Sequence, residues 1–329
     1  MIGYLARRAA SALPTFLGIT LLAFVLLQLL PADPLQPGAG DGTISAEATA
    51  HLRGAAPTPL SPAARYVAWL AALARGDLGR SVHDGRPVTT VLAAALPWTL
   101  LLNASALLLI YGLALPFGLL SAAAPGSGFD RIGGGFLIVL YALPSFAAGL
   151  ILQQWFAVRW DLLPLQGPPD LAPDAGYRET VAATAAHLAL PAVCLALSGW
   201  AFVARYARAV FRSALGRQFL AAARARGLSR LRALGHAAAW SAVPFVTLLA
   251  TILPGLAGGS VMVEQIFSWP GVGRLYLGAI EARDTPVVLG LTLLSAVLVL
   301  GANFIVDLLY AVVDPRIRDR LEGDPVHGN

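Results

Sequence analysis

Six long apolar stretches divide this sequence, and they constrain its fold more than any other feature. They cover residues 9–30, 97–124, 132–158, 182–204, 237–263 and 286–313. A helix needs roughly 20 mostly apolar residues to cross the hydrocarbon core of a bilayer, so each stretch is long enough to span it. Where a stretch is longer, tilting or a bend at an internal proline accommodates the excess. The sequence therefore predicts an all-α polytopic membrane protein with six transmembrane helices.

The overall composition agrees with a membrane protein and excludes several other classes. Of the 329 residues, 57% are hydrophobic and 12% are charged, and the mean hydropathy is +0.70, which is far from the balance of a soluble domain. All 23 basic residues are arginines, and they gather at the flanks of the apolar stretches, so we expect no nucleic-acid binding. Because the chain has no lysine, it cannot form a Walker A loop. The single Cys194 and the scattered histidines predict neither an internal disulfide nor a metal site.

The first apolar stretch follows Arg7 and Arg8, and it is longer than the ~7–15 apolar residues of a cleaved signal peptide. We therefore interpret residues 1–31 as an N-terminal transmembrane helix. Residues 32–95 are polar enough to form an extracytoplasmic loop, with a surface helix from Ser61 to Arg75. After this helix, Gly76 is expected to stop it and Asp77 to begin a turn. Residues 96–315 form the transmembrane core, and residues 316–329 form a tail.

The arginines also predict the orientation of the chain in the membrane. Loops that face the cytoplasm carry an excess of basic residues. The arginines concentrate near both termini and in the segment 211–236, between the fourth and fifth apolar stretches. We therefore expect both termini and this segment to be cytoplasmic.

The basic segment has the pattern of two short helices. Between Arg205 and Arg232 there are eight arginines and no acidic residue. Alanine and arginine favour a helix from Gln218 to Arg226, and Gly227 supplies a left-handed residue that ends it. Ser229 can then cap a second helix. Small alanine side chains on the first helix would let another protein approach its backbone closely.

Several phrases of the sequence are similar to one family of membrane proteins. The alanine pair at 222–223, followed by Gly227 and later by Pro244, resembles the EAA signature of permease subunits of bacterial ABC importers, with Ala221 where that signature often has glutamate. Further phrases look like dipeptide, oligopeptide and nickel importer permeases, in the same order along the chain. They are 76–81, 143–146, 187–191, 267–274, 282–288 and 306–316.

This resemblance implies a type I ABC importer permease fold in the bacterial cytoplasmic (inner) membrane. It implies that the chain is a transport subunit rather than an enzyme and forms half of a translocation path for peptides or a similar small solute. The partners implied are membrane lipid, a second homologous permease, two cytoplasmic ATPase subunits that hold ATP and Mg, and an extracytoplasmic substrate-binding protein. No catalytic residue, cofactor or metal is expected in this chain. The residues implied to contact the ATPases are Gln218, Ala222, Ala223, Arg224, Arg226 and Gly227.

Two further groups are candidates for the path and for the external surface. Gly255 and Gly259 permit close helix approach, and Glu264 follows them at the outer end of the same helix. Ordinary packing within the subunit explains the glycines equally well. A short connection between 266 and 285 contains the candidate docking residues Phe267, Trp269 and Arg274. An aromatic belt at the membrane interface is the competing explanation.

Three alternatives stay open on the sequence alone. A nickel or other small-solute importer permease of the same family would use the same plan. A polytopic membrane enzyme, such as an intramembrane protease, would need a nucleophile such as Ser260 with a histidine base, and only His187 lies near the end of an apolar stretch. A one-chain secondary carrier would be supported by an internal repeat, and we find none.

Overall fold

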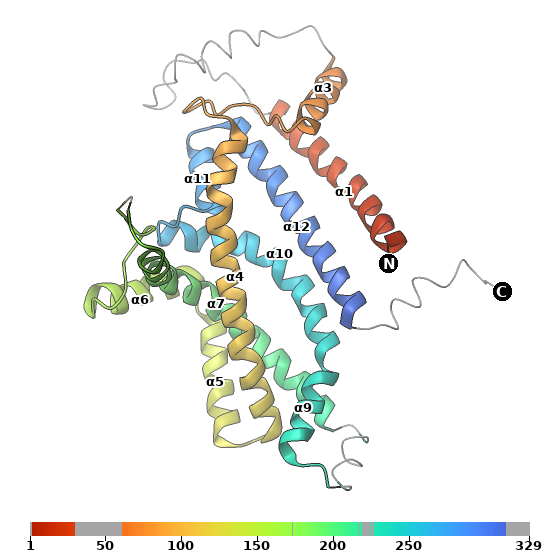
Figure 1. Cartoon of the computed structure of the whole chain (residues 1–329), viewed down its shortest axis with the longest axis vertical. Helices are drawn as coiled ribbons and strands as arrows, with labels where there is room; N and C mark the ends of the chain where they lie inside the picture. Colours follow the sequence, from red (N-terminus) through yellow and green to blue (C-terminus); the bar gives the residue numbers. More distant parts are fainter. Residues whose placement is uncertain are drawn as a thin grey trace, which may run out of the picture. The chain divides into compact units, whose positions relative to one another are not determined.

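The computed structural model describes residues 2–29, 61–172, 174–216, 218, 225 and 227–313. Throughout these residues the regular elements are helices, and a single isolated bridge pairs Arg80 with Pro87. Apart from Met1, the chain divides into two compact units. The first unit contains Leu100–Trp269 and Ala302–Asn329, and the second contains Ile2–Thr99 and Pro270–Gly301. The two are described separately below, and Figure 1 labels their helices.

The second unit begins with helices α1 (Ile2–Leu29) and α3 (Pro62–Ala74). The predicted surface helix is confirmed, and Ser61 caps it by accepting a hydrogen bond from the Ala64 amide. The Tyr66 hydroxyl lies 2.8 Å from the Thr20 hydroxyl of α1, and the Tyr66 ring lies 5.3 Å from that of Phe24. Helix α3 is therefore attached to α1 by polar and aromatic contacts.

The rest of the second unit comprises the first turns of α4 (Val88–Ala123), α11 (Val272–Glu281) and most of α12 (Thr285–Val313). Figure 1 shows α11 beside the start of α4. Their shared core is a cluster of small and branched apolar side chains that leaves little space between the helices. Gly290 of α12 allows this approach, because a Cβ there would lie 2.5 Å from Cγ1 of Val88. The buried members are Val88, Leu92, Ala95, Val272, Ala279, Val287 and Leu291.

The first unit holds the remainder of α4 together with α5 (Gly128–Ala142), α6 (Ser145–Leu152), the π-helix η1 (Gln153–Arg159), α7 (Tyr177–Leu215), α9 (Arg230–Trp240) and α10 (Ala242–Ile266). Residues four apart on α4 form a fully buried stripe, as expected when one helix face packs against neighbours. The stripe consists of Leu102, Ala106, Ile110 and Ala114. It continues to Gly118, where a Cβ would lie 2.5 Å from Cβ of Ala207 on α7. Small residues thus bring these helices together, as they do in membranes.

The described helices agree with a membrane protein but correct some predicted spans. Three helices, α4, α7 and α12, are long and apolar enough to cross a bilayer, and up to five spans result if each of two bent helix pairs is one span. Residues 132–158 do not form one straight helix, because α5 and the α6–η1 segment meet at an angle of 103°. Pro144 explains the break, since the residue before a proline disfavours helical geometry and Leu143 is extended. The count of six spans stays a prediction.

Two side chains of α7 hold the segment that follows this bend. The thiol of Cys194, which is buried, donates a hydrogen bond to the Ser145 carbonyl at the start of α6. His187 Nδ1 donates to the Gly167 carbonyl, at 3.0 Å. This contact gives the His187 side chain a structural role. Both bonds fix connecting backbone to the long helix.

Candidate functional site

The predicted ATPase-contact segment lies between α7 and α9 in the first unit. Helix α7 ends at Leu215, and Gln218 is helical and exposed. Gly227 has φ +94°, and no described atom lies within 4 Å of the place that a Cβ would occupy, which confirms the expected left-handed residue. The other candidates, Ala222, Ala223, Arg224 and Arg226, lie outside the described residues.

Alanines hold the two flanks of this segment together. Ala214 near the end of α7 packs with Ala233 and Ala237 of α9, and all three are fully buried. Ser229 caps α9 by accepting a hydrogen bond from the Arg232 amide, as the sequence predicts. The helix that it starts continues to Trp240. The flanks of the candidate contact segment are therefore fixed to each other within the chain.

The candidate path residues belong to α10. Gly255 and Gly259 are helical, and their surroundings lie outside the described part of the structure. Glu264 is fully buried, with an exposed fraction of 0%. Its backbone carbonyl accepts a hydrogen bond from the Trp269 amide, at 2.8 Å, as the chain turns after the helix. Glu264 therefore lies in the interior of the subunit instead of at an exposed interface.

The aromatic residues after α10 are also interior. Phe267 and Trp269 have exposed fractions of 1% and 0%. The Phe267 carbonyl accepts a hydrogen bond from the Gly167 amide, at 2.8 Å, and Ser268 between the two rings adopts φ +50°. This left-handed residue reverses the chain so that both rings are buried. In this conformation of the chain, the two rings support the fold of the connection and present no surface to a partner.

The connection that follows is not a short turn but a helix with its own core. Gly273 lies within α11, where the sequence predicts a tight turn, and it is buried. The Val272 amide donates to the Thr99 hydroxyl, at 2.7 Å, and fixes the start of α11 to α4. Arg274 is exposed on this helix and is the docking candidate that the structure leaves at the surface.

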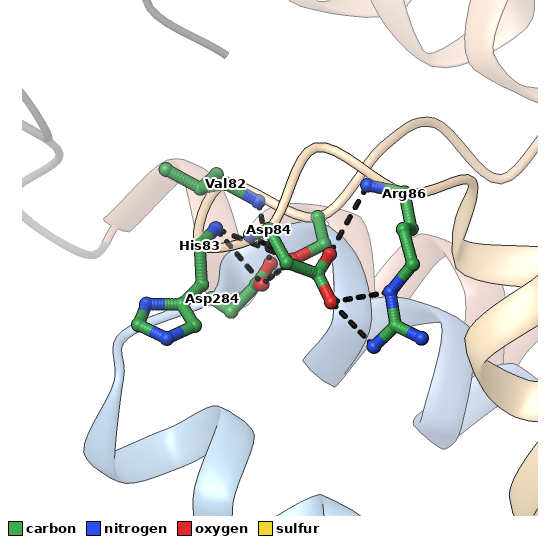
Figure 2. Close-up of polar contacts among 6 residues, drawn as sticks. Val82, His83, Asp84, Arg86 and Asp284 are labelled. Atoms are coloured by element: carbon green, nitrogen blue, oxygen red, sulfur yellow. Dashed lines mark hydrogen bonds and ion pairs between the residues drawn. The ribbon is translucent and has the colours of Figure 1, made fainter. Parts of the chain in front are cut away.

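A buried carboxylate joins two distant segments of the second unit (Figure 2). Asp284, only 4% exposed, accepts a hydrogen bond from the Ser81 hydroxyl, at 2.5 Å, and from the Val82 amide, at 3.2 Å. The His83 amide lies 3.4 Å from it, while the His83 ring points away. Asp284 also accepts from the Val287 amide, at 3.4 Å, in the first turn of α12. One side chain therefore caps α12 and clamps the 81–83 turn to it.

The tip of the same turn carries an exposed ion pair. Arg86 contacts the Asp84 carboxylate through two nitrogens, with Nε at 2.6 Å. Burial tends to raise the pKa of Asp84, but hydrogen bonds from Arg86 outweigh it and lower the pKa below its usual value. The pair is therefore retained into mildly acidic solution. Its exposure limits its contribution to stability.

Sequence reasoning missed the clamp and a group of glutamines. Phrases 76–81 and 282–288 both resemble the permease family, but nothing in a single sequence pairs Ser81 with Asp284. An open hollow of about 490 Å³ lies along α6 and η1 and is lined by aliphatic side chains and Trp155 together with three glutamines. Gln153 and Gln154 lie inside the apolar stretch 132–158 and Gln166 lies beyond it, so the three form no periodic pattern. The polar residues of this hollow are Gln153, Gln154 and Gln166.

Long apolar helices and a basic connecting segment between α7 and α9 are typical of a membrane transport component. Residues 114–319 match the family described as binding-protein-dependent transport system inner membrane component. The chain belongs to this family. Accordingly it is a permease subunit of an ABC importer, a bacterial inner membrane component, and not itself an enzyme.

Relatives match along nearly the whole chain. The oligopeptide transport system permease protein AppB of Bacillus subtilis (strain 168) is 35% identical over 319 residues, which is 96% of this chain and 99% of the relative. The dipeptide transport system permease protein DppB of Escherichia coli (strain K12) is 33% identical over 338 residues, 97% of this chain and 100% of the relative. The di/tripeptide transport system permease protein DppB of Pseudomonas aeruginosa (strain UCBPP-PA14) is 34% identical over 335 residues, with 97% and 99% coverage.

Proposed function

We propose that this chain forms half of a translocation path for peptides. The observation that carries the proposal is its 33–35% identity, over at least 96% of its length, to permease proteins named for oligopeptides, dipeptides and di/tripeptides. A second homologous permease subunit completes the path. Two cytoplasmic ATPase subunits hold ATP and Mg and supply the energy, and an extracytoplasmic binding protein delivers the peptide.

The contact with the ATPases is made by the segment from Gln218 to Gly227. Its flanking helices are fixed to each other by the alanine cluster of α7 and α9, so a push on the segment moves both helices together. Small residues at 222 and 223 let the ATPase approach the backbone. The partner movement then shifts the permease between two packings of its helices.

The candidates on the other side have different roles. Arg274, exposed on α11, contacts the binding protein, while Phe267 and Trp269 hold the adjoining turn in shape from inside. Gly255, Gly259 and Glu264 place α10 along the path. Because Glu264 is fully buried in this chain, it acts in this proposal as part of a gate that opens only when α10 moves.

Reconstitution of the complete transporter tests the proposal. We expect the chain to co-purify with a second permease and two ATPases, and peptide-loaded binding protein to stimulate ATP hydrolysis and uptake of a labelled dipeptide.

Ala222→Glu places charge and bulk in the contact, and we expect it to lower ATPase association at least about tenfold, which corresponds to ~1.4 kcal/mol. Ala63→Glu, at an exposed alanine of α3, is the matched control and leaves association unchanged.

Each outcome bears on a different part of the proposal. Normal association and uptake in Ala222→Glu would remove the contact role of the segment. Uptake of nickel without uptake of peptide would contradict the proposed cargo while keeping the transport role.

In the same assay Arg274→Ala should weaken stimulation of ATP hydrolysis by the loaded binding protein, and unchanged stimulation would remove Arg274 from the docking surface.

We also propose that both termini and the 211–236 segment are cytoplasmic. The arginines of this segment support that orientation through the positive-inside rule. Reporter fusions after residue 228 should be active only with a cytoplasmic reporter, and fusions after residue 84 only with a periplasmic one. The opposite pattern would reverse the orientation and exclude the segment as an ATPase contact.

A further inference from the structure

An ion pair joins α5 to the α7 arm, the last part of α7 from Arg208 to Leu215, which leads to the proposed ATPase contact. Arg208 Nε lies 2.5 Å from Asp130 Oδ1, and Arg208 Nη2 lies 2.7 Å from Oδ2. The Asp130 side chain is 4% exposed and that of Arg208 is 36% exposed. A planar guanidinium that meets a carboxylate with two parallel hydrogen bonds fixes orientation as well as distance.

The carboxylate is held on its other side by the turn between α4 and α5. The Gly126 amide donates to Asp130 Oδ2, at 2.8 Å, and Gly126 itself adopts φ +76°. Ser127 caps α5 by accepting from the Asp130 amide, at 3.2 Å. The turn between α4 and α5 therefore holds the Asp130 carboxylate in place independently of Arg208. A pull on Arg208 is transferred to the first turn of α5.

The position of Arg208 on α7 connects this pair to the ATPase-contact segment, Gln218 to Gly227. Leu215, where α7 ends, is the seventh residue after it in continuous helix, a distance of about 10 Å along the axis. The arm is packed tightly against α4, since a Cβ at Gly118 would lie 2.8 Å from the Arg208 backbone nitrogen. Such close packing transmits displacement instead of absorbing it.

The far end of α5 leads to the bent segment. After the break at Leu143 and Pro144, α6 begins at Ser145, whose carbonyl accepts from Cys194. A Cβ at Gly149 of α6 would lie 3.4 Å from the Phe267 ring, in the turn that follows α10. All of these contacts lie within the first unit, so α5 bridges the arm of α7 to α6.

We propose that Asp130 and Arg208 are positioning residues that transmit movement of the ATPase-contact segment to α5 and α6. This inference rests on the proposed function, because it needs an ATPase to move the segment. The pair acts as a unit. Without the carboxylate, Arg208 loses its bidentate hydrogen-bond partner, and without Arg208 the α7 arm moves independently of α5. Binding of the ATPases themselves does not involve either residue.

A double-mutant cycle in the reconstituted complex tests this role. The variants are Asp130→Asn, Arg208→Gln and the two combined. A further variant, Arg208→Lys, keeps the charge but cannot form two parallel hydrogen bonds to the carboxylate. Arg205→Gln is the matched control, because Arg205 is an exposed arginine one turn earlier on the same helix and lies outside the 211–236 segment. The readouts are complex assembly, basal ATP hydrolysis, stimulation by loaded binding protein, and peptide transported per ATP.

We expect each single change to keep assembly and basal hydrolysis within about twofold, and to lower stimulation and transport per ATP about tenfold. The double variant should lose about tenfold rather than a hundredfold, because two residues of one interaction are non-additive. Arg208→Lys should be intermediate, and Arg205→Gln should resemble the wild type.

Several results would overturn the inference. They are additive losses in the double variant, unchanged stimulation in either single variant, or equal loss of basal and stimulated hydrolysis. Failure of both Asp130→Asn and Arg208→Lys to assemble would assign the pair to folding alone. A wild-type complex that shows no coupled uptake would instead reject the proposed function, so the two failures are distinguishable.

Discussion

Asp284→Ala is expected to lower the free energy of unfolding by roughly 3 kcal/mol, because a charged acceptor with several buried donors disappears at once. Ser81, which is 3% exposed, loses its 2.5 Å hydrogen bond, and the first turn of α12 loses its cap. The midpoint of unfolding in detergent, followed for the purified chain, measures this loss.

Matched variants show whether the clamp is responsible. Asp84→Ala removes an exposed aspartate from the same turn, and its ion pair with Arg86 is worth about 0–1 kcal/mol. Asp284→Asn keeps one acceptor oxygen and should fall between the alanine variant and the wild type. If Asp284→Ala and Asp84→Ala unfold at the same midpoint, the buried hydrogen bonds contribute no net stability.

Gly118→Leu should be the other strongly destabilising change. Even a methyl group at this position would lie 2.5 Å from Ala207 Cβ and 2.8 Å from the Arg208 nitrogen, so backbone has to move. Overpacking of this kind costs typically about 1–3 kcal/mol, and the larger side chain places leucine at the upper end of that range. Unfolding midpoints and the yield of assembled complex should both fall.

The same helix supplies a control with the opposite sign. Gly112 lies six residues earlier on α4 and has no described atom within 4 Å of a Cβ. Gly112→Ala gains up to about 1 kcal/mol of helix propensity and should leave the midpoint equal or higher. If Gly118→Leu is tolerated as well as Gly112→Ala, the close approach of α4 and α7 is not required for stability.

The sequence predicts those features that depend on local chemistry. The helix expected near Ser61 is present, Ser229 caps the helix expected of it, and Gly227 adopts the expected left-handed conformation. The apolar stretches indicate helices because their length alone sets a bilayer crossing. The family phrases, spread over the chain, lead to the family that the comparisons show.

Features that depend on distant contacts could not be predicted in this way. Trp269 is a docking candidate in the sequence because tryptophan is common at binding hot spots, whereas its exposed fraction of 0% depends on tertiary packing. Pro144 permits a bend in the stretch 132–158, but the angle of 103° between its two parts depends on tertiary packing. Asp130 and Arg208 are 78 positions apart, and a single sequence carries no signal that they meet.

The buried thiol of Cys194 has a practical consequence for spectroscopy. This is the only cysteine in the sequence, and with an exposed fraction of 1% it is shielded from water-soluble maleimides and nitroxide reagents. Cysteines introduced at exposed positions can therefore be labelled selectively without first replacing the native one. Pairs of such labels would report distances in a chain whose α6–α7 attachment through Ser145 is left intact.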